Sequence, residues 1–169
     1  MSHPPPPPAR SPAFSPLLTA ALALACALGA CGADERAAEI DRGAIEELLA
    51  DYLPRLAEAY RTGDVEVLRE VASEKELAAM TKQIGDLMSQ EGRVIEPTLE
   101  SFTVEDINVW NYSNAFVTTI EVWDLKVLAS GTDQVLSEVQ DQRSRVKYQL
   151  KRRDDGWQIL SRIRETTFE

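Results

Sequence analysis

Two carboxylates in the second half of the chain are spaced so that either could act as a general base. Glu121 alternates in phase with Thr119 and Trp123, and Asp124 falls in the opposite phase, with Val122. If one of them were buried among apolar side chains, desolvation would raise its pKa toward the range useful for proton transfer. The plainer alternative is that the polar members of an alternating strand face water, or that Asp124 marks a bent strand end.

Aromatic residues could supply the other parts of a binding or catalytic site. Tyrosine and tryptophan combine a large apolar ring with one polar group, so they often lie in a core with one edge near water. The same side chains can line a pocket for a lipid, a sterol-like molecule or a hydrophobic peptide. We expect most of them to fill the core, and the candidate pocket residues are Tyr52, Tyr60, Phe116, Trp123 and Tyr148.

The sequence contains very few histidine and cysteine residues. The only histidine is His3, and the two cysteines are Cys26 and Cys31. Residues 31–169 therefore contain neither a histidine nor a pair of cysteines. This excludes Cys/His zinc sites, Ser-His-Asp catalysis and an internal disulfide in that part of the chain. We expect no metal site and no cofactor.

A row of positive side chains occupies one parity of a predicted strand, whereas Val146, Tyr148 and Leu150 occupy the other. Such a row could attract anionic lipid headgroups, an acidic partner or the acidic helices of a second copy. It could also be a solvated face whose charges resist aggregation. The candidate basic patch consists of Arg143, Arg145, Lys147, Lys151 and Arg153.

Length and composition favour one globular domain with an uneven charge distribution. The 169 residues are 44% hydrophobic and 27% charged, with a net charge of −10. Residues 31–106 hold 19 acidic and 8 basic side chains, whereas residues 107–169 hold 9 of each. Binding to nucleic acid requires a clustered basic excess, so we expect no nucleic-acid partner.

The first half of the chain has the 3.6-residue periodicity of amphipathic helices. Three helices are predicted, from about residue 39 to 62, over 65–72 and over 73–91. Pro54 lies inside the first pattern, which predicts a kink near Asp51 or two helices meeting there.

The second half alternates with a period of two and is rich in β-branched and aromatic residues. A shift in the phase of its apolar residues predicts a bulge at Glu105-Asp106, and Asp155-Gly156 predicts a tight turn. These patterns predict an α+β domain with three N-terminal helices packed on a four-stranded antiparallel sheet. The predicted strands run roughly over Thr98–Trp110, Ala115–Leu128, Glu138–Arg153 and Trp157–Glu165.

The N-terminal segment has the features of an export signal. Its apolar stretch, residues 17–28, is too short to span a membrane. Leu28-Gly29-Ala30-Cys31 resembles the lipobox of bacterial lipoproteins, which implies that Cys31 is acylated, becomes the new N-terminus and holds the chain on a membrane. The predicted organisation is a signal peptide over 1–30, a short tether over 31–38 and one domain over 39–169. An ordinary secretory signal with an incidental cysteine is the alternative.

The same resemblance implies a location in the cell envelope. Gly32, rather than an aspartate, follows the cysteine. In a cell with two membranes this favours the outer membrane, with the domain facing the periplasm. In a cell with one membrane the domain would lie on the outer face of the plasma membrane.

The order of the predicted elements resembles the NTF2-like superfamily, which includes SnoaL-like and ketosteroid-isomerase-like proteins. The resemblance spans about Arg36 to Glu165 and rests on the end of the first helix, Tyr60-Arg61-Thr62-Gly63-Asp64, and on the hairpin from Val146 to Ile159. The paired strands of that hairpin resemble IMS-type domains of membrane-attached proteins. The fold implied is a cone in which a curved sheet wraps around the helices and opens into a pocket.

Three functions from different classes remain open at this point. The first is a non-enzymatic envelope lipoprotein that binds a small apolar ligand or a protein partner. The second, implied by the SnoaL-like resemblance, is an isomerase, dehydratase or hydrolase that uses Asp124 or Glu121 with a tyrosine. The third is a structural homodimer with the sheet face as its interface.

Overall fold

Two helices and one short 3-10 helix form the N-terminal half of the domain. In the computed structural model, which describes residues 42–168, the first helix covers residues 42–62. The 3-10 helix η1 spans Val65–Leu68, and α2 spans Glu74–Ser89. The first helix continues through Pro54, so two helices do not meet near Asp51.

The three-helix prediction is wrong at its second member, because residues 65–72 do not form an α-helix. Asp64 caps η1, and a turn over residues 69–71 then leads to Ala72, where the chain meets the sheet. The amide of Ile159 donates to the Val71 carbonyl at 2.9 Å, and the amide of Ser73 donates to the Ile159 carbonyl at 2.8 Å. These bonds fix an isolated parallel bridge between Ala72 and Ile159, which ends the helical stretch after Leu68.

The second half forms the predicted four-stranded antiparallel sheet, in the order β1-β2-β3-β4. A register shift between Val104 and Asp106 confirms the predicted bulge. The first strand begins five residues before the predicted Thr98, because Pro97 is tolerated on an edge strand, where its missing N–H costs no ladder bond. The strands are β1 (Arg93–Trp110), β2 (Asn114–Ala129), β3 (Val135–Arg153) and β4 (Gly156–Phe168).

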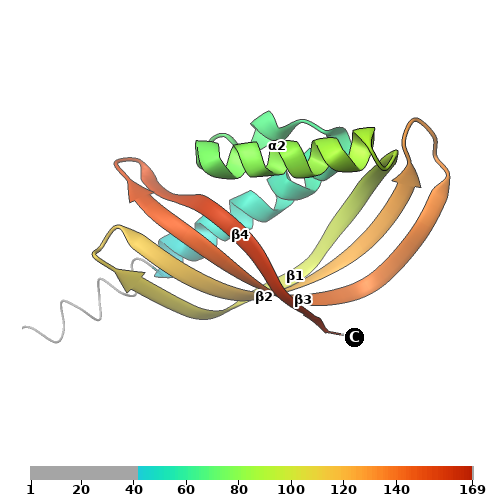
Figure 1. Ribbon diagram of the computed structural model, residues 1–169. Coiled ribbons are helices and arrows are strands. Elements are labelled where there is room, and N and C mark those ends of the chain that lie inside the picture. The colour runs from blue at the N-terminus through green and yellow to red at the C-terminus, as the bar shows by residue number, and fades with distance from the viewer. Residues whose placement is uncertain (1–41, 169) are drawn as a thin grey trace, which may run out of the picture. The chain divides into compact units, whose positions relative to one another are not determined.

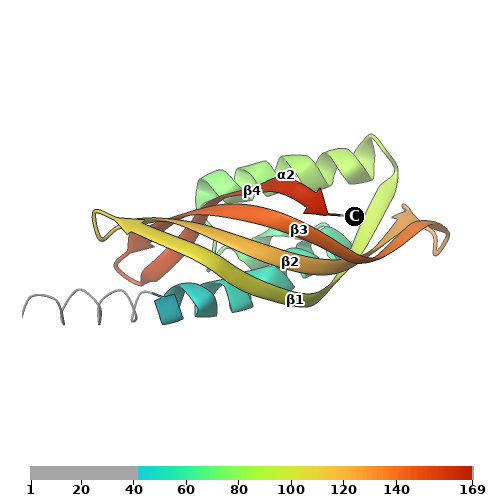
Figure 2. The same ribbon diagram turned by 90° about the horizontal axis from the view of Figure 1, so that it is seen from below.

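The helices cover one face of the sheet and leave the other face open, which gives the predicted α+β layers (Figure 1). The view from below shows the strands lying across the helices (Figure 2). The core between the layers is built from side chains that are at most 6% exposed, among them Leu49, Leu53, Leu56, Met80, Ile84, Val117, Val146, Leu150 and Ile159. Ser73 Oγ accepts the amide of Glu76 at the start of α2 and so caps the helix.

The predicted signal peptide, the tether and the lipidation site Cys31 lie outside the described residues. Between residues 42 and 168, no helix has the length and apolar character needed to cross a bilayer.

Candidate functional site

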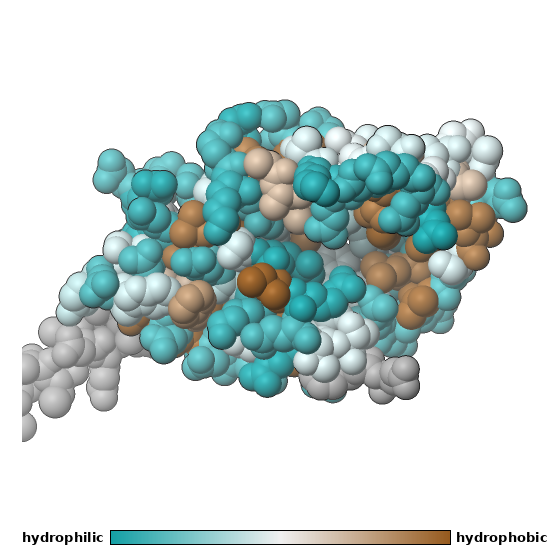
Figure 3. Space-filling view, in the orientation of Figure 1, coloured by the Kyte–Doolittle hydropathy of each residue, from teal (hydrophilic) through white to brown (hydrophobic). Residues whose placement is uncertain are grey.

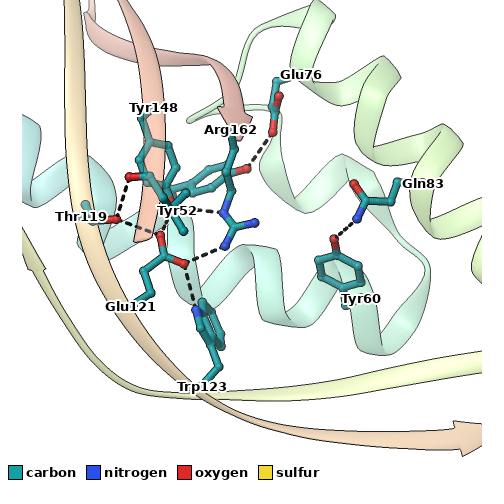
Figure 4. Close-up of polar contacts among 10 residues, drawn as sticks. Tyr52, Tyr60, Glu76, Gln83, Thr119, Glu121, Trp123, Tyr148 and Arg162 are labelled. Atoms are coloured by element: carbon teal, nitrogen blue, oxygen red, sulfur yellow. Dashed lines mark hydrogen bonds and ion pairs between the residues drawn. The ribbon is translucent and has the colours of Figure 1, made fainter. Parts of the chain in front are cut away.

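A buried polar cluster surrounds Glu121, on the face of β2 that points toward the helices. The Glu121 side chain is completely buried, and Figure 4 shows it among Thr119, Trp123, Tyr148 and Arg162. Its carboxylate accepts four hydrogen bonds, from Thr119 Oγ1 at 3.1 Å, Trp123 Nε1 at 2.9 Å, Tyr148 Oη at 2.5 Å and Arg162 Nη2 at 2.7 Å. Because all four donors are protein groups, the carboxylate is satisfied without a ligand.

The charge of Glu121 is fixed by its surroundings. Burial alone would raise the pKa of this carboxyl, but the neighbouring Arg162 guanidinium and the hydrogen bonds outweigh it and hold the pKa below the usual value. Burial would lower the pKa of Arg162, whereas the nearby Tyr148 and Glu121 raise it. The two groups therefore form a buried ion pair, and Glu121 lacks the raised pKa that a general base needs.

A second buried contact joins the helices to this cluster. Tyr52 of the first helix donates to Glu76 of α2 at 3.0 Å, and its ring meets that of Tyr148 edge-on, with centroids 6.0 Å apart. Desolvation raises the pKa of Tyr52 well above its usual value, and the Glu76 charge acts in the same direction. Tyr52 therefore stays protonated and works as a hydrogen-bond donor.

A cavity of about 360 Å³ opens beside the cluster. This volume is within the usual range of small-molecule sites. Its lining contains two arginines and no acidic side chain, although the whole protein is strongly acidic. The lining residues come from the first helix, α2, β1, β2 and β4, and they are Leu56, Ala57, Tyr60, Met80, Gln83, Leu87, Ile95, Pro97, Trp123, Leu125, Arg162 and Arg164.

Arg162 connects the buried cluster to the cavity. Its Nη2 binds Glu121, and its Nε donates to Tyr148 Oη at 3.1 Å. Its other terminal nitrogen, Nη1, forms no hydrogen bond with another residue in the range 42–168, and Figure 4 shows it pointing toward the side where Tyr60 and Gln83 lie. The guanidinium is thus held in one orientation with a free N–H group available to the cavity.

A hydroxyl group adds to these donors. Tyr60 Oη accepts a hydrogen bond from Gln83 Nε2 at 2.7 Å. Burial raises the pKa of the Tyr60 hydroxyl, so the group keeps its proton and can donate a hydrogen bond to a ligand. The cavity therefore combines apolar walls with N–H and O–H donors and a net positive charge, which suits an anionic group attached to an apolar body.

The structure separates the predicted pocket residues into three places. Tyr60 and Trp123 line the cavity. Tyr52 and Tyr148 are buried behind it, in the polar clusters. Phe116 does not belong to the pocket: it lies on the opposite face of the sheet, 39% exposed, with its ring 4.6 Å from that of Trp110.

Neither predicted catalytic carboxylate lines the cavity. Glu121 lies behind Arg162, as described above. Asp124 is at a register shift of the β2–β3 ladder, between Trp123 and Leu125. Its Oδ1 accepts the backbone amide of Asp141 at 2.8 Å. The contact satisfies an amide of the irregular part of β3, which is a structural role.

The predicted basic patch lies on the outer face of the sheet, away from the cavity. Arg145 is 3.2 Å from Glu105 and 4.0 Å from Glu165, and Lys147 is 3.9 Å from Glu165. Lys147 also lies 5.2 Å from the centre of the Phe116 ring. Acidic neighbours on the same face thus balance part of the row, and this is typical of a solvated sheet surface.

The two cavity arginines were missed by the sequence analysis. In the start of β4, Trp157 and Ile159 face the helices, and strict alternation would place Ile163 on that face and the arginines outside. A register shift between Gln149 and Leu150 reverses the phase of β4. Ile163 is consequently 60% exposed, while the Arg162 side chain is only 11% exposed. The sequence did contain one indication of this reversal, because the apolar Ile163 lies between two arginines.

Metal binding has no support in the part of the chain that is described. Residues 42–168 contain no group of three or more acidic, histidine or cysteine side chains arranged to hold a metal ion.

Comparisons with known proteins agree with this architecture. The domain family described as "ARC6-like, IMS domain" matches residues 59–160, which confirms the resemblance to IMS-type domains. No curated protein shows a significant match to the chain.

Solved structures that align with the chain have low sequence identity. The intermembrane space region of the chloroplast protein ARC6 aligns with a TM-score of 0.61 at 18% identity, covering 73% of this chain and 95% of that one. A periplasmic fragment of TraM aligns with a TM-score of 0.52 at 14% identity, covering 74% and 97%. An NTF2-like protein with a cystatin-like fold from Novosphingobium aromaticivorans has a TM-score of 0.46 at 21% identity, covering 79% and 86%.

Proposed function

Because the chain belongs to the ARC6-like IMS domain family, we propose that it is a non-enzymatic binding module on the envelope side of a membrane. Its cavity holds a ligand with an apolar body and an anionic end. The family description supports an envelope-side location. The observation that carries the binding proposal is the guanidinium of Arg162, which is oriented by Glu121 and Tyr148 and has one terminal nitrogen directed to the cavity.

Electrostatics support an anionic ligand over a neutral one. Glu121 balances the charge of Arg162, and Arg164 adds a second positive charge to the cavity lining. An anion bound there gains from both guanidinium groups, and its apolar body is removed from water by side chains such as Leu56, Met80 and Leu125. Preorganisation of Arg162 lowers the entropic cost of binding.

The carboxylate-based enzyme is less well supported by the same geometry. A general base needs a free lone pair facing the substrate and a pKa near the working pH. Glu121 accepts four hydrogen bonds and has a lowered pKa, and Asp124 accepts a backbone amide. Neither carboxylate belongs to the cavity lining.

Membrane attachment through Cys31 completes the proposal. Its support is the Leu28-Gly29-Ala30-Cys31 motif after an apolar stretch that is too short to span a bilayer. Two acyl chains on one residue hold a protein stably, because each buried methylene contributes about 0.8 kcal/mol. Palmitate labelling tests it: labelling is expected in the wild-type chain and in Cys26→Ser, and it should disappear in Cys31→Ser. Labelling that survives Cys31→Ser would refute the anchor.

Calorimetric titration tests the cavity. The full chain carrying Cys31→Ser is titrated with decanoate and with decanol, which has the same chain length but no charge. We expect decanoate to bind at least about tenfold more tightly than decanol, and Arg164→Gln to remove most of that difference. Arg153 is an exposed arginine on β3 outside this cavity. Arg153→Gln is therefore the matched control and should leave the difference in affinity between decanoate and decanol unchanged. Equal affinities for the acid and the alcohol would contradict the proposal.

A further inference from the structure

Strand β3 extends beyond the end of its neighbour β4. The β3–β4 pairing runs from Arg153 opposite Gly156 to Arg143 opposite Phe168. Residues 135–142 of β3 lie beyond this ladder. Within residues 42–168 they pair only with β2, for example Val139 with Leu125 and Glu138 with Lys126. One backbone edge of this segment is therefore open, in line with the end of β4.

The open segment carries apolar side chains in contact with solvent. Val135, Leu136 and Val139 are 44–48% exposed, every residue from 131 to 141 is exposed, and Gln142 is half-buried. Figure 3 shows hydrophobic side chains gathered at the end of the molecule where the β2–β3 hairpin rises beside α2. Backbone groups and apolar side chains are thus available together.

The charges in and next to the segment are all negative. Residues 135–142 contain Glu138 and Asp141, the preceding turn contains Asp133, and residues 131–142 have no lysine or arginine. Natural edge strands are usually protected by lysine, proline or a bulge. The segment has neither lysine nor proline, whereas the opposite edge strand, β1, contains Pro97. Its protective features are two irregularities of the β2–β3 ladder, one near Asp141 at the end next to β4 and one at Leu136, between Val135 and Ser137.

We propose that residues 135–142 of β3 form a docking edge for an extended segment of a protein partner that carries lysine or arginine among apolar residues. The partner segment adds a strand to the sheet, in line with β4. Main-chain hydrogen bonds supply the affinity in such strand addition, and alternate side chains supply the specificity. This inference does not depend on the ligand proposed for the cavity.

Charge favours such a partner over a second copy of this chain. Two copies paired edge to edge would bring Glu138 and Asp141 of both chains into one ribbon. Like charges on paired strands are destabilising, whereas opposite charges stabilise the pair. Basic residues of a different chain, by contrast, would face Glu138 and Asp141 of the segment, with Asp133 just before it.

The test uses the full chain and a defined probe. The probe is a capped eight-residue peptide in which lysine and valine alternate, and the comparison peptide alternates glutamate and valine. Hydrogen–deuterium exchange is followed with and without peptide. We expect the lysine peptide to slow amide exchange at least tenfold within residues 135–142, and the glutamate peptide to have no effect. No protection in that segment, or protection on β1 instead, would overturn the proposal.

Two double variants distinguish peptide binding at this edge from general electrostatic attraction to an acidic protein. The double variant Asp133→Lys/Glu138→Lys should bind the lysine peptide at least tenfold more weakly than the wild-type chain does. Asp154→Lys with Glu100→Lys changes the net charge by the same amount elsewhere on the surface and should leave binding unchanged. Equal loss in both double variants would show non-specific attraction and refute the docking edge.

Modified peptides test whether backbone pairing is used. N-methylation of alternate residues removes the N–H groups along one edge of the peptide and keeps every side chain. Of the two possible alternating patterns, one should abolish binding and the other should preserve it, because a strand pairs through one edge. Preserved binding with both patterns would refute strand addition. Protection that increases with protein concentration alone would assign the edge to a second copy and also refute the proposal.

Discussion

Arg162 Nη2 lies 2.7 Å from Glu121 Oε2, so that β4 is tied to β2 across the inner face of the intervening strand. Tyr148 of β3 completes the connection, because its hydroxyl donates to Glu121 and accepts from Arg162. The same contact orients the guanidinium that lines the cavity. The stability of the domain and the proposed ligand binding therefore depend on one ion pair.

Removal of the Glu121 charge should strongly destabilise the domain. In Glu121→Gln the Arg162 guanidinium stays buried without its counter-ion, and breaking a buried pair in this way costs about 3–5 kcal/mol. Urea unfolding of the full chain measures the change. Glu46→Gln removes an exposed pair with Arg42 on the first helix and should cost less than about 0.5 kcal/mol. A loss below about 1 kcal/mol in Glu121→Gln would show that the pair contributes little.

Glu76 should make the folded state less stable as the pH rises. Burial raises the pKa of this carboxyl above its usual value, although the hydrogen bond from Tyr52 and the charge of Arg162 act in the opposite direction. A group with a higher pKa in the folded chain binds more protons there. The stability it contributes is therefore present below the unfolded pKa and is lost as the pH rises through the folded pKa.

Glu76→Gln removes this titration and still offers an acceptor to Tyr52. Relative to wild type, the variant should gain stability at neutral pH and lose that advantage below the usual pKa of glutamic acid, about 4.3. Urea unfolding across pH 4–8 compares the two chains. Glu121, with a lowered pKa, has the opposite sign: its contribution is lost as the pH falls through the lowered value. A Glu76→Gln effect that is constant with pH would contradict the explanation.

The sequence predicts the elements of this fold better than it predicts the site. Alternation and turn residues locate all four strands, because the sheet has one buried and one open face. Short helical patterns are less specific, and the stretch 65–72 leaves the helix after Leu68 and turns to the sheet, where it bonds to Ile159, a residue far along the chain. No local pattern contains that contact.

The candidate site depends on a register shift that sequence periodicity cannot show. Arg162 and Arg164 reach the cavity only because β4 changes phase opposite Gln149 and Leu150. A single shift moves every later side chain to the other face. Glu121 was correctly expected to share a face with Trp123, but its buried partner lies on another strand and could not be identified.

Two glycines provide a test of local backbone conformation. Gly63 follows the first helix with φ +79°, and a Cβ there would lie 2.9 Å from Met88 Sδ. Gly63→Ala should therefore cost about 1–2 kcal/mol, mainly from the left-handed backbone. Gly85 lies within α2 with open space around it, so Gly85→Ala should stabilise the domain by about 1 kcal/mol. Thermal unfolding of both variants measures the two changes in stability. If both variants were destabilised, or both stabilised, the backbone conformations given for these two glycines would be contradicted.

Asp124 should behave as a structural acceptor for the bulge in β3. Its carboxylate accepts the amide of Asp141, a residue with φ +53°. Asp124→Ala removes this charge-assisted bond and should cost about 1.5–3 kcal/mol, whereas Asp124→Asn keeps an acceptor and should cost less. Because Asp141 is within the docking edge, the alanine variant should also exchange its 139–142 amides faster. If Asp124→Asn lost as much stability as Asp124→Ala, the negative charge rather than the hydrogen bond would be the stabilising feature.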